Sequence, residues 1–106
     1  MQEKTTMDRS TPLKLISYTY TTDSIGQKVA QDTSRMVYCN LRSVSRSEWM
    51  QAGQMGLKPS FQASMFAYDY NGEKEVELKG KRYGVYRTYF SANDIIELYL
   101  EEKAGV

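Results

Sequence analysis

The side chains that most often catalyse reactions or bind metals are scarce in this sequence. The 106 residues include no histidine and one cysteine, Cys39. A structural zinc site needs several Cys or His ligands, and a Ser-His-Asp triad needs a histidine base, so both are excluded. Nothing close to Cys39 in the sequence would lower the pKa of its thiol, and we interpret Cys39 as a small buried hydrophobic residue.

Carboxylates are the next candidates for chemistry. Glu73, Glu75 and Glu77 alternate with Lys74 and Val76, which is typical of a solvent-facing strand rather than of a paired general acid and base. The sequence contains no Ser-x-x-Lys motif and no phosphate-binding loop. We therefore expect neither an enzyme nor a bound cofactor.

Aromatic residues beside arginine suggest one binding function. The chain has nine tyrosines, and Arg82-Tyr83 and Tyr86-Arg87-Thr88-Tyr89 place cations next to rings that could stack on bases. A small OB-like barrel that binds single-stranded nucleic acid is therefore an alternative function. The net charge of +1 does not favour it, because such a groove is normally basic.

The elements that would position these residues begin with one short helix. Ser45 and Glu48 have the spacing of a capping box, with Val44 and Trp49 at the positions of a hydrophobic staple. We expect Trp49 to pack its helix onto the rest of the domain. Gly53 and Gly56 both offer an end to the helix.

The surrounding sequence has the alternation of β-strands. Strands are predicted over residues 13–22, 35–44, 61–70, 75–79 and 81–89, with a short, polar second hairpin arm over 28–32. Turns are predicted at Asp23–Gly26, Asn71-Gly72 and Gly80. Residues 91–101 fit a helix or a strand, and the alternation of Ile96, Leu98 and Leu100 with glutamates favours the strand.

Two faces and one pairing follow from these patterns. Val37, Cys39 and Leu41 share one strand face. Val76 and Leu78 are expected opposite Tyr83 and Val85 in a tight hairpin. The fold class is therefore mainly β, a small barrel or sandwich of about six short antiparallel strands with one helix inserted near residues 46–55.

The expected organisation is a single domain. Residues 1–12 are polar and without periodicity, which predicts a flexible N-terminal arm. Residues 13–103 then form the domain, with a helical insertion over 45–58. No apolar run approaches the length of a membrane span, and the N-terminus lacks the features of a signal peptide, so we expect no membrane contact.

Five stretches together resemble a known family. They are the turn with Thr22-Asp23 and Gly26, the strand end Tyr38–Val44, the insertion Ser47–Gln54, the hairpin Leu78–Val85 and the last strand Ile96–Leu100. Over residues 13–102 the chain resembles the tailed-phage head closure proteins, also called head–tail joining, head–tail connector or stopper proteins. The most specific parts are Glu48-Trp49 followed by Gln51-Ala52-Gly53, and Gly80-Lys81-Arg82-Tyr83.

The resemblance implies a structural virion protein made in the bacterial host cytoplasm. Such a subunit would join a ring in the phage neck, between the portal-bound adaptor ring and the tail or a tail-completion protein. The ring would close the DNA-filled head and provide the surface for tail attachment, with packaged DNA in its channel. An adjoining tail-completion role is the closest alternative.

The helical insertion would then contact neighbouring subunits or line the channel. The residues expected at this interface are Arg46, Glu48, Trp49, Met50, Gln51, Gln54 and Met55. Met50 and Met55 lie off the face that carries Trp49, and exposed methionine suits an adaptable interface. Arg42, Arg46 and Lys58 would face DNA or an acidic neighbour, or else be ordinary solvated charges.

The two halves of the chain differ in charge. Residues 1–60 carry eight Lys/Arg and five Asp/Glu, whereas residues 61–106 carry six Lys/Arg and eight Asp/Glu. This difference would suit head-to-tail contacts in a ring.

Overall fold

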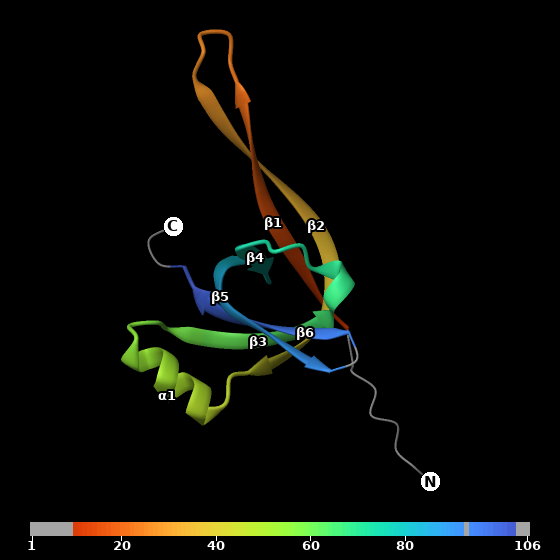
Figure 1. Ribbon diagram of the computed structural model, residues 1–106, viewed down its shortest axis with the longest axis vertical. Helices are drawn as coiled ribbons and strands as arrows, with labels where there is room; N and C mark the ends of the chain where they lie inside the picture. The colour runs from red at the N-terminus through yellow and green to blue at the C-terminus, as the bar shows by residue number, and fades with distance from the viewer. Residues whose placement is uncertain (1–9, 93, 104–106) are drawn as a thin grey trace.

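The computed structural model describes residues 10–92 and 94–103, and this part of the chain forms a closed antiparallel β-barrel with one α-helix. The strand order around the barrel is β1-β2-β3-β6-β5-β4 (Figure 1). The predicted mainly β fold of about six antiparallel strands with one short helix is confirmed, and of the two predicted architectures, barrel or sandwich, the chain adopts the barrel. The elements are β1 (Thr11–Thr22), β2 (Lys28–Ser43), α1 (Arg46–Gln54), β3 (Pro59–Phe66), β4 (Glu75–Leu78), β5 (Lys81–Ala92) and β6 (Ile95–Glu102).

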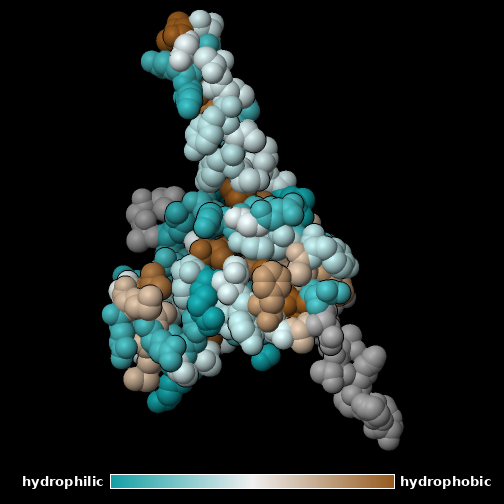
Figure 2. All heavy atoms as spheres, in the orientation of Figure 1, coloured by the Kyte–Doolittle hydropathy of each residue, from teal (hydrophilic) through white to brown (hydrophobic). Residues whose placement is uncertain are grey.

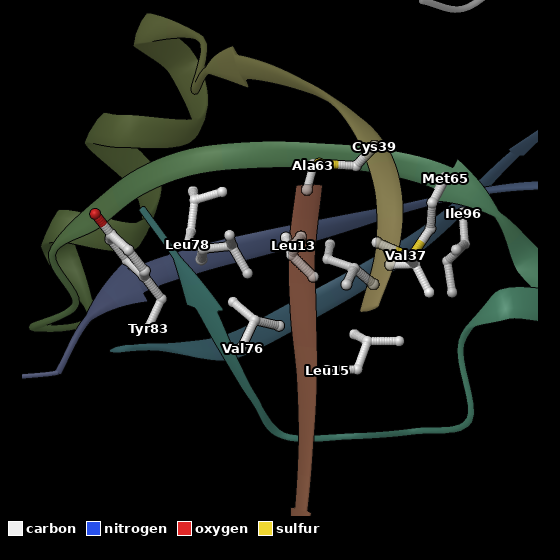
Figure 3. Packing of buried hydrophobic residues seen from close by; sticks show 12 residues of the cluster. Leu13, Leu15, Val37, Cys39, Ala63, Met65, Val76, Leu78, Tyr83 and Ile96 are labelled. Atoms are coloured by element: carbon white, nitrogen blue, oxygen red, sulfur yellow. The ribbon is translucent and has the colours of Figure 1, made fainter. Parts of the chain in front are cut away.

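The core fills the barrel because alternate residues of each strand point inward. β1 contributes Leu13 and Leu15, which lie among Val76, Val37 and Ile96 in Figure 3. β6 contributes Ile96, Leu98 and Leu100. The remaining core residues are Val37, Cys39, Ala63, Met65, Val76, Leu78 and Tyr83. The shared inward face of Val37, Cys39 and Leu41 is confirmed, as is the choice of strand rather than helix for the last element.

Cys39 is fully buried in this core, as expected of a small hydrophobic residue. Burial disfavours the charged thiolate and raises the pKa of the Cys39 thiol to about 11. The thiol is therefore unreactive in the folded protein near neutral pH.

The strand pattern differs from expectation in β2. The predicted arm over 28–32 and the predicted strand over 35–44 are one continuous strand. Ser34 and Thr33, which lie between the two predicted segments, pair with Ile16 and Ser17 of β1. A long partner strand supplies cross-strand pairs throughout, so a locally polar stretch without Gly or Pro continues the strand.

Other boundaries also shift. β1 begins at Thr11, so Thr11 and Pro12, assigned from the sequence to the flexible N-terminal segment, belong to the barrel. Ser10 precedes the strand, and residues 1–9 of that expected segment lie outside the described residues. β3 ends at Phe66, earlier than predicted, in a 3-10 turn over Ala67–Asp69. Val76 does face Tyr83, but Leu78 faces Lys81, because the β4–β5 turn contains only Lys79 and Gly80, both with positive φ.

Part of the β1–β2 hairpin projects out of the barrel (Figure 1). We call residues 17–34 the arm. β4 pairs with β1 only as far as Ile16, and β3 pairs with β2 only from Asn40 onward. Every residue of the arm is exposed. At about 3.3 Å per residue, the six residues from Ser17 to Thr22 extend roughly 20 Å.

A polar cluster fixes the base of the arm to the barrel. The Tyr18 hydroxyl donates to Glu75 Oε1 at 2.6 Å, and Arg82 pairs with Asp32, Glu75 and Glu77 at 3.3–3.4 Å. Lys103 also pairs with Glu75, at 2.8 Å. The hydrogen bonds from Lys103 and Tyr18 lower the pKa of the Glu75 carboxyl. The orientation of the arm's base is therefore set by contacts among four strands, β1, β2, β4 and β5, together with the residue after β6.

No helix within the described ranges has the length and hydropathy needed to cross a membrane.

Candidate partner interface

The start of α1 follows the local sequence signal. Ser45 is the N-cap in an extended conformation, and its Oγ accepts a hydrogen bond from the Glu48 backbone N–H at 3.1 Å. This is one half of the predicted capping box. The other half, in which Glu48 would accept from the Ser45 backbone, is replaced by contacts with a distant strand.

Glu48 instead connects α1 to β5. Its carboxylate accepts from Arg87 Nη2 at 2.6 Å and from the Tyr86 hydroxyl at 2.7 Å. The Arg87 guanidinium lies 4.0 Å from the centre of the Tyr99 ring, a cation–π geometry. We call Glu48, Tyr86, Arg87 and Tyr99 the latch. Because hydrogen bonds between charged groups are stronger than a bond to a neutral backbone N–H, the carboxylate favours the latch over the cap.

The latch changes the acidity of its members. The hydrogen bond from Arg87, with that from Tyr86, lowers the pKa of the Glu48 carboxyl against an opposing effect of partial burial. Burial and the hydrogen bond to Glu48 raise the pKa of the Tyr86 hydroxyl. Near neutral pH the latch thus contains one carboxylate, one guanidinium and two neutral phenols.

The end of α1 is set by Gly56 rather than Gly53. Gly56 has a φ of +83°, and its N–H donates to the Gly53 carbonyl at 3.0 Å. The Leu57 N–H donates to the Ala52 carbonyl, also at 3.0 Å. These two bonds form a Schellman motif, which requires a left-handed residue at the position of Gly56.

α1 makes few apolar contacts with its own barrel. Ala52 is its only buried residue within the described chain. Trp49, Met50 and Met55 are 58%, 52% and 75% exposed. The expectation that Trp49 packs onto the domain is therefore wrong. Glu48 and Ala52 face the barrel, and Trp49 and Met50, one and two positions after Glu48, are rotated away from that face.

Trp49 and Val44 still share a surface hollow, at the positions predicted for the staple. We call this hollow the α1 groove. It has a volume of about 680 Å³ and lies between the start of α1 and the start of β3. Its lining consists of Ser43, Val44, Ser45, Arg46, Trp49, Met50, Pro59 and Ser60.

The other predicted interface residues are distributed over the insertion. Gln51, Gln54 and Arg46 are exposed. Glu48 is the exception, since its side chain is only 11% exposed and is held in the latch. Its side chain is therefore placed to orient α1 rather than to touch another molecule.

The three predicted DNA-facing cations are also exposed. Arg42, Arg46 and Lys58 form no ion pair with the described residues. Only Arg46 lines the α1 groove. The Lys58 backbone N–H donates to Glu101 Oε1 at 3.3 Å, which ties the end of the insertion to β6.

Sequence reasoning did not find the latch or the arm. Arg87 is separated from Glu48 by 39 residues, and the period-two pattern of β5 does not indicate a partner on α1. For the arm, one weak sequence signal was present: no Gly or Pro interrupts the stretch between Lys28 and Ser43.

Comparison of the chain with known protein families and with curated protein sequences finds no match.

Proposed function

We propose that this chain is a structural subunit of the neck of a tailed phage or prophage. In this function it joins a ring between the portal-bound adaptor and the tail, closes the filled head and offers a surface for tail attachment. The proposal combines the family resemblance of residues 13–102 with the geometry of the insertion. A tail-completion subunit of the same neck is its nearest variant.

The observation that carries the proposal is the exposed apolar surface of the helical insertion. The barrel holds α1 through Ala52 and the latch, while Trp49, Met50 and Met55 remain on the surface. Trp49 and Met50 line the α1 groove, and Met55 follows the last residue of α1 outside the groove. Exposed apolar groups beside a hollow on a lone domain usually mark a contact with another chain. A subunit that acquires its partners only on assembly has such a surface.

Single-stranded nucleic-acid binding receives less support. Arg82 pairs with three carboxylates and Arg87 with Glu48, so the cations that alternate with tyrosines are already neutralised. Tyr83 is buried in the core, and Tyr86 donates its hydroxyl to Glu48. The stacking surface predicted from Arg82 to Tyr89 therefore lacks free positive charge. Binding of a labelled oligonucleotide at two salt concentrations separates the two functions, since strong, salt-sensitive binding by the isolated protein would favour this alternative.

The direct test is electron microscopy of purified phage heads with and without the protein. We expect added density below the portal when the protein is present, and retention of packaged DNA. Heads that bind no protein under conditions where tails attach would contradict the proposal. Mass measurement of the free protein is expected to give a monomer or a weak associate, whereas a stable closed oligomer at micromolar concentration would count against assembly on a template.

The double variant Met50→Glu, Met55→Glu tests the role of α1 in the same assay. It should fold normally, because both side chains are exposed, and yield particles that leak DNA or lack tails. Met36→Glu is the matched control, since Met36 is 51% exposed but lies on β2 in the barrel. Infectious virions assembled from the double variant would show that α1 is not the contact surface.

A further inference from the structure

The arm has no internal means of support beyond its base. A two-stranded ribbon is at best marginally stable in water, because it has no third strand or packed face. Here residues 17–22 and 28–33 pair only with each other within the described chain, and all are exposed. The cluster around Tyr18 and Arg82 stabilises the base and leaves the distal half unsupported.

The end of the arm is well defined and apolar. Asp23 Oδ1 accepts from the backbone N–H groups of Ile25 and Gln27, at 3.0 and 2.8 Å, and Gly26 has a φ of +87°. This turn holds Ile25 outward with 76% of its surface exposed. Figure 2 shows a hydrophobic side chain at the end of the arm, beyond a stretch of polar surface. Tyr20 and Val29 add exposed apolar surface just below the turn.

A complementary surface lies at the other end of the molecule. The α1 groove is lined by Val44, Trp49, Met50 and Pro59, and its volume of about 680 Å³ is large enough for several side chains. The arm and α1 extend from opposite ends of the barrel (Figure 1). The arm of one molecule therefore cannot fill the groove of the same molecule.

The two surfaces also match in charge. Asp23 is the acidic residue of the turn, and it forms no ion pair in the described structure. Arg46 lines the groove and likewise has no ion-pair partner among residues 10–92 and 94–103. An apolar tip bearing one carboxylate thus corresponds to an apolar groove bearing one guanidinium.

We propose that the tip of the arm, Asp23–Gln27, seats in the α1 groove of a second copy of this chain. Ile25 then packs against Val44, Trp49 and Met50 of that copy, with Asp23 close to Arg46. The contact joins different surfaces on the two molecules, and such head-to-tail contacts close into rings when the rotation permits. The inference rests on the proposed function, because it supplies the contact between neighbours in the neck ring.

Disulfide trapping between full-length variants tests the contact without any phage component. Ile25→Cys protein is mixed with Met50→Cys protein at high concentration and oxidised with copper phenanthroline. Cys39 is buried and does not take part. We expect the mixed disulfide dimer to form faster than in a control mixture of Ile25→Cys with Tyr68→Cys, whose position is 73% exposed on another surface. Equal rates in the two mixtures would overturn the proposal.

A charge test follows in the same mixtures. Asp23→Asn keeps an oxygen for the turn and removes the charge, and Arg46→Gln removes the charge in the groove. Each change is expected to lower the trapping rate about two- to fivefold, which corresponds to an exposed ion pair of roughly 0.5–1 kcal/mol. The two changes together should lower the rate no further than either alone, and fully additive effects would rule out the Asp23–Arg46 pairing.

The trapping and electron-microscopy results together separate this inference from the proposed function. Trapping without added density on phage heads would reject the neck function and keep the arm contact. Added density without trapping would reject the arm contact alone.

Discussion

The Glu48 carboxylate of α1 and the Arg87 guanidinium of β5 lie 2.6 Å apart, and Arg87 also covers the ring of Tyr99. Glu48 is the third residue of a helix that buries only one side chain among those described, so this pair supplies much of what orients the helix. The apolar surface of the insertion is therefore presented in a fixed direction by a charge pair.

Removing Arg87 should loosen α1 without unfolding the barrel. For Arg87→Ala we expect α1 to lose about 1 kcal/mol of docking free energy, since hydrogen bonds between charged groups of partial exposure contribute at about this level. Trp49 is the only tryptophan in the chain and lies on α1, so its fluorescence reports this change. The expected result is a Trp49 transition at lower urea than the circular dichroism transition of the barrel. Arg42→Ala, at an exposed arginine without an ion pair, is the control and should keep the two transitions coincident.

Lowering the pH should weaken the docking of α1 onto the barrel. Because the Arg87 hydrogen bond lowers the pKa of Glu48 in the folded state, the latch contributes fully above the ordinary glutamate pKa of 4.5, and its contribution is lost as pH falls through the lower, folded-state pKa. Trp49 fluorescence is therefore expected to change as pH falls below this range. Glu48→Gln should weaken α1 docking at neutral pH and reduce its dependence on pH. An unchanged pH profile in Glu48→Gln would place the acid effect elsewhere, for example at Glu75, whose carboxyl pKa is also lowered, by Lys103 and Tyr18.

The two glycines of the insertion should respond in opposite directions to alanine. Gly56→Ala places a Cβ on a residue with a φ of +83° and is expected to cost about 1 kcal/mol. Gly53 lies within α1 and has open space around its Cβ position, so Gly53→Ala should stabilise the helix by roughly 0.5–1 kcal/mol. Urea titration followed by Trp49 fluorescence measures both. Similar effects from the two substitutions would contradict the Schellman end at Gly56.

Core and arm substitutions should separate stability from assembly. Leu98→Ala removes a fully buried side chain and is expected to reduce the free energy of unfolding by about 3 kcal/mol. Ile25→Ala, at the exposed tip, should change it by less than about 0.5 kcal/mol. Chemical denaturation followed by circular dichroism gives both values. A large loss from Ile25→Ala would mean that the tip supports its own fold rather than a neighbour.

The reactivity of Cys39 should report global unfolding. Its thiol is fully buried with a pKa raised to about 11, so alkylation by iodoacetamide at mildly alkaline pH is expected to be slow in the native protein. In urea the rate should rise together with the loss of circular dichroism from the barrel. Rapid alkylation without denaturant would show that the barrel opens locally around β2.

The sequence by itself determined the local features of this protein. Ser45 set the start of α1 through a hydrogen bond within a few residues, and Gly53 and Gly56 limited its end to two positions, of which the structure uses Gly56. The alternation of Ile96, Leu98 and Leu100 placed a strand with the correct inward face. These features depend on neighbours along the chain, so short patterns contain them.

Only the tertiary structure decided the rest. It joined two predicted segments into β2, because β1 offers pairing partners along its whole length. The Glu48 carboxylate bonds to Arg87 instead of completing the capping box, because Arg87 comes within reach only in the folded barrel. In this arrangement Trp49 remains exposed beside the α1 groove. These contacts depend on charged groups and strand edges that come together only when the barrel closes. The position of the arm relative to α1 likewise depends on closure of the barrel.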